Sequence, residues 1–389
     1  MDHPVINPVI ARYNRRQLLK RMAVVASAGA LGPTFAACAA DTAPTSSGSE
    51  GIGGDIDFLG WEGYDLPAEM KAFNAKRDIT FNGTYIATSD DVQAKLKAGA
   101  SVAYDLTNYY HGYFSLYQQL GIISEMDESK LPNLSYVDDF FKTSDAAQQF
   151  WVVDGKRYAV PFTWGTTTCD YLPDKIDPPQ AWEDLLKDEF KGKVGWVPDA
   201  TGAITLTGVI LGLTPPNYTQ AEFDEILSFL RKMRAQIPGF AASFGDLTNQ
   251  FVSGDVVVDF AGWAAVTSFA KPKDTTIATT IPTEGSYSFC DSWALPDTSD
   301  NTDTVLAWIN AALDPKVQAE AAQTLVGGVV EGEAADLLDD VTRDLYATAY
   351  DESFAAHFEA AGLYGLPDDD NEVNREMWLK EFAKIQSGD

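Results

Sequence analysis

Hydrophobic residues change their spacing repeatedly along the chain, and the changes predict strands and helices in alternation. Runs rich in β-branched and aromatic residues predict strands over residues 56–60, 79–86 and 104–108. Helices are predicted between them over residues 66–76 and 89–98, and the second begins with a capping serine followed by acidic residues. Elements in this order predict a parallel sheet with helices on both faces.

A second block of the same kind begins after Pro161. Strands are predicted over residues 163–171, 194–197 and 256–260. Helices are predicted over residues 181–186, 204–211, 219–234, 303–313 and 315–325, and the tail from residue 334 to 386 is predicted to be helical and acidic. The pattern therefore predicts an α/β protein.

The body that follows residue 54 has roughly 330 residues, more than one hydrophobic core usually supports. We therefore expect two α/β lobes with a ligand cleft between them, because ligands bind at the carboxyl ends of strands in open α/β sheets. We assign residues 55–166 and 292–326 to the first lobe, and residues 167–291 and 327–389 to the second. The chain would cross near residues 164–171 and again near residues 291–296.

The first 54 residues do not continue this pattern. Arg15 and Arg16 precede a short, mildly apolar run, which predicts an export signal for residues 1–38 rather than a membrane span. The arginine pair resembles a twin-arginine signal. Residues 35–38 resemble a bacterial lipobox, which implies that Cys38 becomes a lipidated N-terminus; an ordinary signal peptide with a chance cysteine is the alternative. Residues 39–54 are rich in Ser, Thr, Gly and Pro and predict a flexible linker.

The charge and the residue types restrict the possible functions. A net charge of −29 argues against nucleic-acid binding and suits a protein that attracts cations, although an acidic surface that keeps the protein soluble explains it equally well. Of the three histidines, only His111 and His357 follow the predicted signal, and neither lies in a metal-binding or hydrolase motif. We therefore expect no enzyme, no metal ion and no cofactor. A carboxylate-dependent glycosidase is a weaker alternative, because nothing places two acids at a defined separation.

The stretch from residue 281 to 296 carries the most informative single residue. Asp291 lies among Phe289, Trp293 and Leu295 in a predicted strand. A carboxylate among large apolar residues is costly to desolvate unless a partner meets it, and a cationic ligand is one such partner. An acid on the solvent face of an edge strand is the alternative.

A series of short motifs resembles the extracytoplasmic solute-binding proteins of ABC importers, specifically the spermidine/putrescine-binding type. The motifs follow one another from about residue 55 to 325, and their order and spacing are more specific than any one of them. They are W-E-G-Y at 61–64, V-Q-A-K-L-K at 92–97, A-Y-D-L at 103–106, D-E-S-K-L-P-N at 127–133, Y-A-V-P at 158–161, W-G-T-T at 164–167, A-W-E-D-L at 181–185, E-F-K-G-K-V at 189–194 and P-T-E-G at 282–285.

The resemblance implies a type II periplasmic-binding-protein fold that closes by a hinge around a polyamine or similar small cation. It also implies a monomer, held at the membrane by its lipid, that delivers the solute to a permease and an ATPase. Carried over by position, aspartates would anchor ammonium groups while aromatic rings pack on methylene groups. The positions are Trp61, Tyr64, Tyr110, Asp199, Phe260, Phe289 and Asp291, of which Phe260 and Phe289 stand where the family has tryptophans.

The sequence departs from the family in ways that leave specificity open. Gly202 stands where a glutamate is expected, and a G-G-V-V segment at 327–330 replaces a tyrosine-proline segment. Loss of one carboxylate favours a shorter diamine, an amino-containing acid or a related cation. Ferric-ion binding through Tyr110, His111 and Tyr113 is an alternative, as is a sensor or adhesin with the same lobes.

Two further expectations concern packing. Trp164 and Trp263 are expected to pack the lobes rather than contact a ligand. Cys169 and Cys290 fall in the predicted crossover strands, where either a disulfide or two buried thiols would be consistent with export.

Overall fold

A mixed sheet forms the centre of the larger of two lobes. The computed structural model describes residues 51–98 and 103–388, so Cys38, the export signal and most of the predicted linker lie outside the described residues. Residues 50–389 form one unit. Within its described part, the larger sheet has the strand order β13-β7-β12-β3-β1-β2, with β4 beside β12. The strands are β1 (Gly54–Gly60), β2 (Ile79–Tyr85), β3 (Leu106–Tyr110), β4 (Ile123–Ser124), β7 (Ala159–Thr166), β12 (Ser288–Pro296) and β13 (Gly328–Val329).

Strands β7 and β12 carry the chain out of this lobe and back into it. They lie side by side and run in opposite directions, and β12 is also antiparallel to β3. Only β1 pairs in parallel fashion, with β2 and β3. The sheet is therefore mixed, which corrects the expectation of a mostly parallel sheet. The reason is that the chain leaves and returns through neighbouring strands.

The second lobe is built on a smaller sheet with the order β11-β8-β10-β9. This sheet is also mixed, because β10 is parallel to β9 and antiparallel to β8. Its strands are β8 (Cys169–Tyr171), β9 (Val194–Gly195), β10 (Val258–Asp259) and β11 (Ala278–Thr280). Its helices are α7 (Ala200–Ile210), α8 (Gln220–Arg234), α9 (Phe244–Ser253) and α10 (Ala265–Ala270).

The two predicted crossings lie at β7–β8 and just before β12. The first falls inside the predicted range of residues 164–171. The second comes a few residues before the predicted range 291–296, because β12 stays paired with β7 from Ser288 onward. Cys169 and Cys290, the two cysteines within the described residues, are buried free thiols rather than a disulfide.

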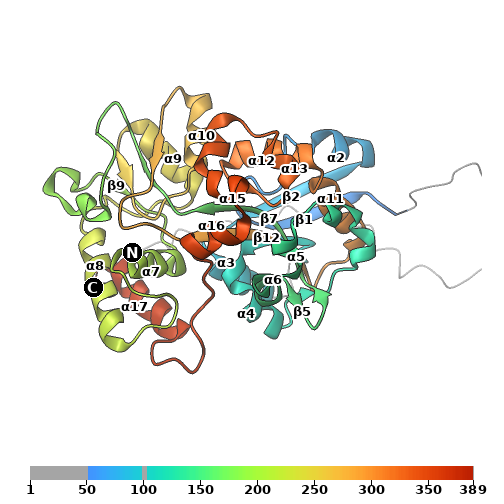
Figure 1. Ribbon diagram of the computed structural model, residues 1–389, viewed down its shortest axis with the longest axis horizontal. Helices are drawn as coiled ribbons and strands as arrows, with labels where there is room; N and C mark the ends of the chain where they lie inside the picture. The colour runs from blue at the N-terminus through green and yellow to red at the C-terminus, as the bar shows by residue number, and fades with distance from the viewer. Residues whose placement is uncertain (1–50, 99–102, 389) are drawn as a thin grey trace, which may run out of the picture. The chain divides into compact units, whose positions relative to one another are not determined.

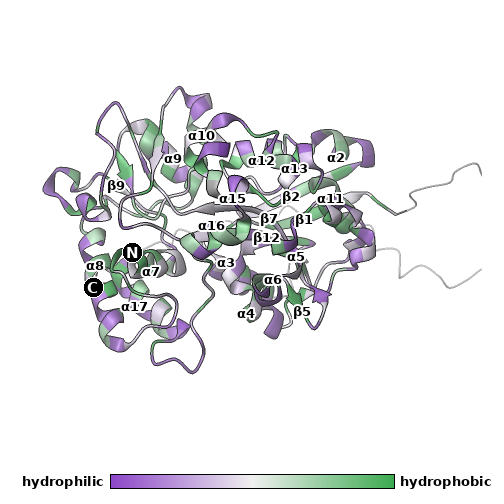
Figure 2. Ribbon diagram, viewed as in Figure 1, coloured by the Kyte–Doolittle hydropathy of each residue, from purple (hydrophilic) through white to green (hydrophobic). Residues whose placement is uncertain are grey.

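Helices of the larger lobe pack against its sheet and a small hairpin formed by β5 (Val152–Val153) and β6 (Lys156–Arg157). Figure 2 shows hydrophilic residues along outward turns such as those of α2. The helices are α2 (Lys71–Arg77), α3 (Ser89–Lys97), α4 (Phe114–Gln119), α5 (Asp139–Thr143), α6 (Asp145–Phe150), α11 (Thr302–Ala312), α12 (Pro315–Leu325) and α13 (Gly332–Ala335). Residues His111–Tyr113 form a 3-10 turn, η1, directly after β3.

Local sequence explains why some predicted helices are found and one is shortened. The predicted helix over residues 219–234 is confirmed as α8, which begins with a reciprocal capping box between Thr219 and Glu222. The predicted helix over residues 66–76 begins only at Lys71. Leu66 has a φ of 46°, which an α-helix does not tolerate, and the preceding residues form turns.

The C-terminal tail is helical, as predicted, but it contacts both lobes. β13 pairs with β7 of the larger sheet, and the ring centroids of Phe358 and Trp164 lie 5.1 Å apart. α17 packs instead on α7 and α8, and Figure 1 shows it in red beside them. The tail helices are α14 (Asp340–Leu345), α15 (Ala347–Asp351), α16 (Phe354–Ala361) and α17 (Arg375–Ser387). The assignment of residues 327–389 to the second lobe stays a prediction.

Across residues 51–98 and 103–388, we find no helix with the length and apolar character needed to cross a bilayer.

Candidate functional site

A cavity of about 80 Å³ lies where the two lobes meet, and residues from both lobes line it. This is room for several water-sized groups. The described lining residues are Trp61, Ala87, Tyr110, Thr167, Val197, Asp199, Gly202, Ala203, Phe244, Ala261, Gly262, Trp263, Tyr287, Phe289 and Asp291. The structure therefore brings five of the predicted site residues to one cavity, and leaves Tyr64 and Phe260 outside its lining.

Asp291 enters the cavity from β12 of the larger sheet. Its side chain is 6% exposed, and the Tyr64 hydroxyl donates a hydrogen bond to Oδ2 at 2.5 Å. Burial raises the pKa of Asp291 to about 7, and the hydrogen bond from Tyr64 opposes this rise only in part. Tyr64 itself is fully buried, stacked on Trp263 with ring centroids 6.1 Å apart. Tyr64 therefore orients the Asp291 carboxylate through this hydrogen bond and does not itself line the cavity.

Asp199 faces the cavity from the second lobe, at the start of α7. Its Oδ2 accepts the backbone N–H of Gly202 at 2.8 Å, so it caps the helix. Its Oδ1 is buried and has no hydrogen-bond partner among the described residues. Burial, with smaller contributions from the charges of Asp90 and Asp91, raises the pKa of Asp199 to about 7 against the opposing hydrogen bond from Gly202. The residue thus caps a helix, lines the cavity and keeps one buried oxygen without a partner among the described residues.

The cavity contains acids without matching bases. Among the described residues that line it, none is Lys, Arg or His. A buried carboxylate is stable when it is paired with a cation or when it takes up a proton. The described lining offers no cation, so a ligand with ammonium groups would provide the matching charge.

Aromatic rings form most of the remaining wall. The ring of Phe244 lies between those of Trp61 and Trp263, with centroid distances of 6.5 and 5.2 Å. The indole N–H of Trp61 is buried and finds no partner among the described residues. Tyr110, Tyr287 and Phe289 complete the aromatic lining. Such rings can cover methylene groups and attract a cation through their faces.

Phe260 was expected to contact the ligand and Trp263 to pack the lobes, but the structure places Trp263 at the cavity and Phe260 in the core. Phe260 is fully buried against Trp182 and Trp196, with centroids 5.8 and 5.1 Å away, and does not line the cavity. Trp263 lines it, although it was expected only to pack the lobes. Ala261, with a φ of 56°, turns the chain between them and directs the residues that follow toward the cavity.

Tyr287 is a lining residue that the sequence analysis did not identify. The signal was present, because Tyr287, Phe289 and Asp291 are spaced by two residues and therefore lie on one face of an extended segment. Gly202 belongs to the same part of the wall. A Cβ atom at Gly202 would lie 2.7 Å from Oδ2 of Asp199 and 3.1 Å from the Tyr287 hydroxyl. A larger residue there would displace the capping carboxylate.

The polar groups proposed for ferric-ion binding are engaged elsewhere. Tyr110 donates its hydroxyl to the carbonyl oxygen of Tyr364 at 2.6 Å, and the hydroxyl of Tyr113 donates to Asp90 at 3.0 Å. His111 accepts the N–H of Cys290 at 3.1 Å through Nδ1, and burial lowers the pKa of His111 to about 3. Among the described residues there is no group of three or more His, Cys, Asp and Glu side chains suited to a metal ion.

The chain is similar to several known proteins. The chain is similar to the spermidine/putrescine-binding periplasmic protein of Escherichia coli, with 26% identity over 69% of this chain and 75% of the relative. It is also similar to the putrescine-binding periplasmic protein SpuD of Pseudomonas aeruginosa, with 25% identity over 86% and 92% of the two chains. The two relatives are named for polyamines.

A solved structure shares the fold. The spermidine/putrescine ABC transporter substrate-binding protein PotD of Streptococcus pneumoniae superposes with a TM-score of 0.64, covering 86% of this chain and 99% of the other, at 17% identity. Residues 68–344 match the family model of the bacterial extracellular solute-binding proteins. The chain belongs to this family, and its fold is the two-lobe, type II fold of periplasmic binding proteins.

Proposed function

We propose that this protein is the substrate-binding subunit of an ABC importer and that it captures a polyamine-like cation between its lobes. The observation that carries the proposal is the pair of buried acids, Asp199 and Asp291, in an aromatic cavity whose described lining contains no base. The relatives named for spermidine and putrescine support the same class of ligand. No covalent chemistry is needed for this role.

The two acids come from different lobes, so a ligand that contacts both acids would favour the closed arrangement of the lobes. Asp291 belongs to the larger sheet and Asp199 to the first turn of α7. A diamine that reaches both carboxylates makes charge-assisted hydrogen bonds to both lobes at once. A ligand that binds the closed arrangement better than the open one shifts the protein toward closure.

The size of the cavity and the place of Gly202 favour a short diamine. Asp199 and Tyr287 occupy the space beside Gly202 where a further acidic side chain would begin. The site then offers two carboxylates instead of three. We expect putrescine, with two ammonium groups, to satisfy this site better than spermidine, with three.

The cellular setting is part of the proposal. An extracytoplasmic location, an anchor at Cys38, a monomeric state and delivery to a permease and an ATPase follow from the lipobox-like sequence and from the family. A Cys38→Ser variant should leave the membrane fraction. A variant that stays there would contradict the anchor without affecting the binding site.

A thermal-shift screen of protein that lacks the signal tests the binding proposal. Putrescine, spermidine, amino acids, choline and ferric ion are added in turn. Only the compounds with amino groups are expected to raise the melting temperature. A ligand at 100 times its Kd adds about 2.7 kcal/mol to the free energy of unfolding. Asp291→Asn should remove most of the shift.

Asp105→Asn is the matched control, because Asp105 is a buried acid of the same lobe that does not line the cavity. It should keep the ligand-induced shift even where its own melting temperature is lower. An equal shift in wild type and Asp291→Asn would contradict the assignment of the site. Stabilisation by ferric ion alone would favour the metal-binding alternative.

A further inference from the structure

Residues 362–374 cross between the two lobes, in addition to the crossings before β8 and β12. They begin after α16, which packs on Trp164 of the larger lobe, and end at α17, which packs on α7 and α8. The backbone N–H of Ser288 donates to the carbonyl oxygen of Gly362 at 2.9 Å at one end. At the other, the backbone N–H of Asp368 donates to Oδ1 of Asn217 at 3.0 Å. The segment is therefore attached to both lobes.

This crossing segment also touches the wall of the candidate site. The hydroxyl of Tyr110 donates to the carbonyl oxygen of Tyr364 at 2.6 Å, and the ring of Tyr110 lines the cavity. The position of the C-terminal segment is thus linked to the position of a cavity residue on β3 of the larger lobe.

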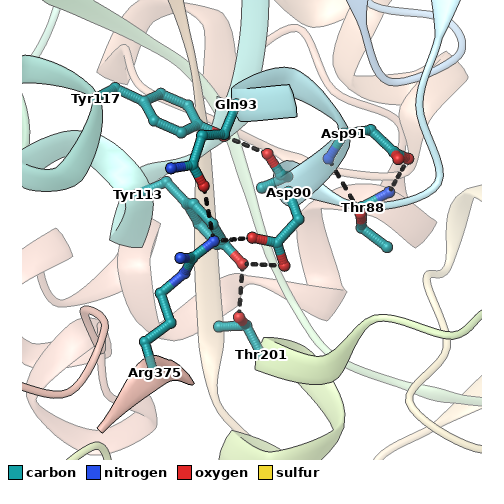
Figure 3. A network of polar contacts seen from close by, with 9 residues as sticks. Thr88, Asp90, Asp91, Gln93, Tyr113, Tyr117, Thr201 and Arg375 are labelled. Atoms are coloured by element: carbon teal, nitrogen blue, oxygen red, sulfur yellow. Dashed lines mark hydrogen bonds and ion pairs between the residues drawn. The ribbon is translucent and has the colours of Figure 1, made fainter. Parts of the chain in front are cut away.

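Arg375 ends the crossing and reaches back to the larger lobe. It is the first residue of α17, where the helix dipole disfavours a positive charge, so its placement calls for an anionic partner. That partner is Asp90 in the first turn of α3, with which it forms an ion pair, and Nη2 also donates to Gln93 at 2.9 Å. Figure 3 shows the guanidinium group directed at both side chains. It also lies 5.5 Å from the centre of the Tyr113 ring.

A second chain of hydrogen bonds runs beside the ion pair. The hydroxyl of Tyr113 donates its single proton to Oδ2 of Asp90 at 3.0 Å and therefore accepts from the hydroxyl of Thr201, 2.8 Å away. Thr201 lies in the first turn of α7, two residues after Asp199. Figure 3 shows both connections converging on Asp90.

We infer that Asp90, Gln93, Tyr113, Thr201 and Arg375 form a clasp that holds the lobes closed. Asp90, Gln93 and Tyr113 belong to the larger lobe, whereas Thr201 and Arg375 belong to helices packed in the second lobe. Opening the lobes separates the two sets and breaks every contact between them. None of these five residues lines the described wall of the cavity, so the clasp favours closure in the free protein as well as in the complex.

The clasp therefore affects both the apparent affinity for the solute and the rate at which the solute dissociates. Apparent affinity is the intrinsic affinity multiplied by the closed fraction of the free protein. Removing the clasp lowers that fraction and speeds opening, so the dissociation rate rises while the cavity keeps its own groups. The pair is only partly exposed, with side-chain exposures of 19% and 26%, so it is less screened than a surface pair.

The test compares the ligand-free radius of gyration of wild type with those of Arg375→Gln and Asp90→Asn by small-angle X-ray scattering. Both variants should be more expanded than wild type. The double variant should be little more expanded than either single variant, because each single variant already removes the ion pair between Asp90 and Arg375. Lys384→Gln is the matched control, since Lys384 forms its ion pair with Glu381 inside α17, at 2.6 Å; it should match wild type.

Putrescine dissociation, followed by stopped flow, provides the second readout. Arg375→Gln and Asp90→Asn should dissociate about tenfold faster, within the usual range of coupling between sites. Scattering curves equal to wild type in both variants would overturn the clasp, whatever the binding result. The scattering comparison uses no ligand, so it stays decisive if putrescine proves not to bind and the proposed function fails.

Discussion

At the scale of single residues, protons and a cationic ligand compete for Asp199 and Asp291. Burial raises the pKa of each to about 7, so protonation of both carboxyl groups becomes important near neutral pH. A bound ammonium group stabilises the ionised carboxylate and lowers its pKa. Binding near or below pH 7 must therefore release protons.

We predict that affinity for putrescine is highest above about pH 8 and falls as the pH falls through 7. The amine stays charged across this range, so the loss comes from protonation of the two acids. Protonation of each acid should weaken binding by up to about tenfold for each pH unit below its pKa. Calorimetric titration at pH 8, 7, 6 and 5, in two buffers with different heats of ionisation, measures both the Kd and the protons released. A Kd that stays constant from pH 5 to 8 would contradict the pKa shifts.

Both predicted acids lie at the cavity, whereas the rings around them differ from the expectation. Asp291 was conspicuous as a carboxylate within an apolar run, and Asp199 matched a family position. Trp263 and Phe260 were interchanged because one backbone angle, at Ala261, decides which of them faces the cavity. Neither pattern nor spacing predicts a positive φ at a non-glycine residue.

At the scale of elements, the junction between β13 and α13 contains an unpaired buried acid. Glu331 has no exposed surface, and neither of its carboxyl oxygens has a partner among the described residues. Gln318 of α12 is also buried there, with an unpartnered Nε2. Burial, together with Asp314 and Glu333, raises the pKa of Glu331 to about 9. The residue is therefore protonated in the folded protein at neutral pH.

Glu331→Gln should stabilise the protein at pH 8. In wild type the folded chain keeps the Glu331 proton up to about pH 9, whereas the unfolded chain loses it near its ordinary value of 4.5, so stability falls as the pH rises between these values. The uncharged glutamine removes this loss, and we expect a gain of about 1–3 kcal/mol at pH 8 in urea unfolding.

The gain should shrink toward zero at pH 5, where Glu331 is protonated in the folded chain and increasingly so in the unfolded chain. Glu320→Gln serves as the control, since Glu320 is an exposed glutamate on α12, the helix that also carries Gln318. An equal gain in the control, or a gain that does not depend on pH, would contradict the assignment of a buried proton to Glu331.

Most elements could be predicted from the sequence, but strand direction could not. Hydrophobic spacing and capping residues located β1, β2, α3 and α8 to within a few residues. The antiparallel pairing of β7 and β12 depends on contacts between residues more than 120 positions apart, such as Cys290 with Trp164. Local pattern carries no information about such pairs.

At the scale of the whole molecule, two lobes bring together acids that lie far apart in the sequence. The net charge of −29 adds an attraction for cations that should speed their capture at low salt. The family predicts the two lobes and the cleft. It gave no indication of the crossing at residues 362–374 or of the clasp at Arg375, because the C-terminal helices matched the family only loosely.

A crystal structure of the signal-free protein with putrescine tests the central proposal most directly. We predict one ligand nitrogen about 2.7–2.9 Å from a carboxylate oxygen of Asp199 and the other at a similar distance from Asp291, with the methylene groups against Trp61 and Trp263. A ligand bound outside this cavity, or a cavity that stays empty at saturating putrescine, would contradict the proposal.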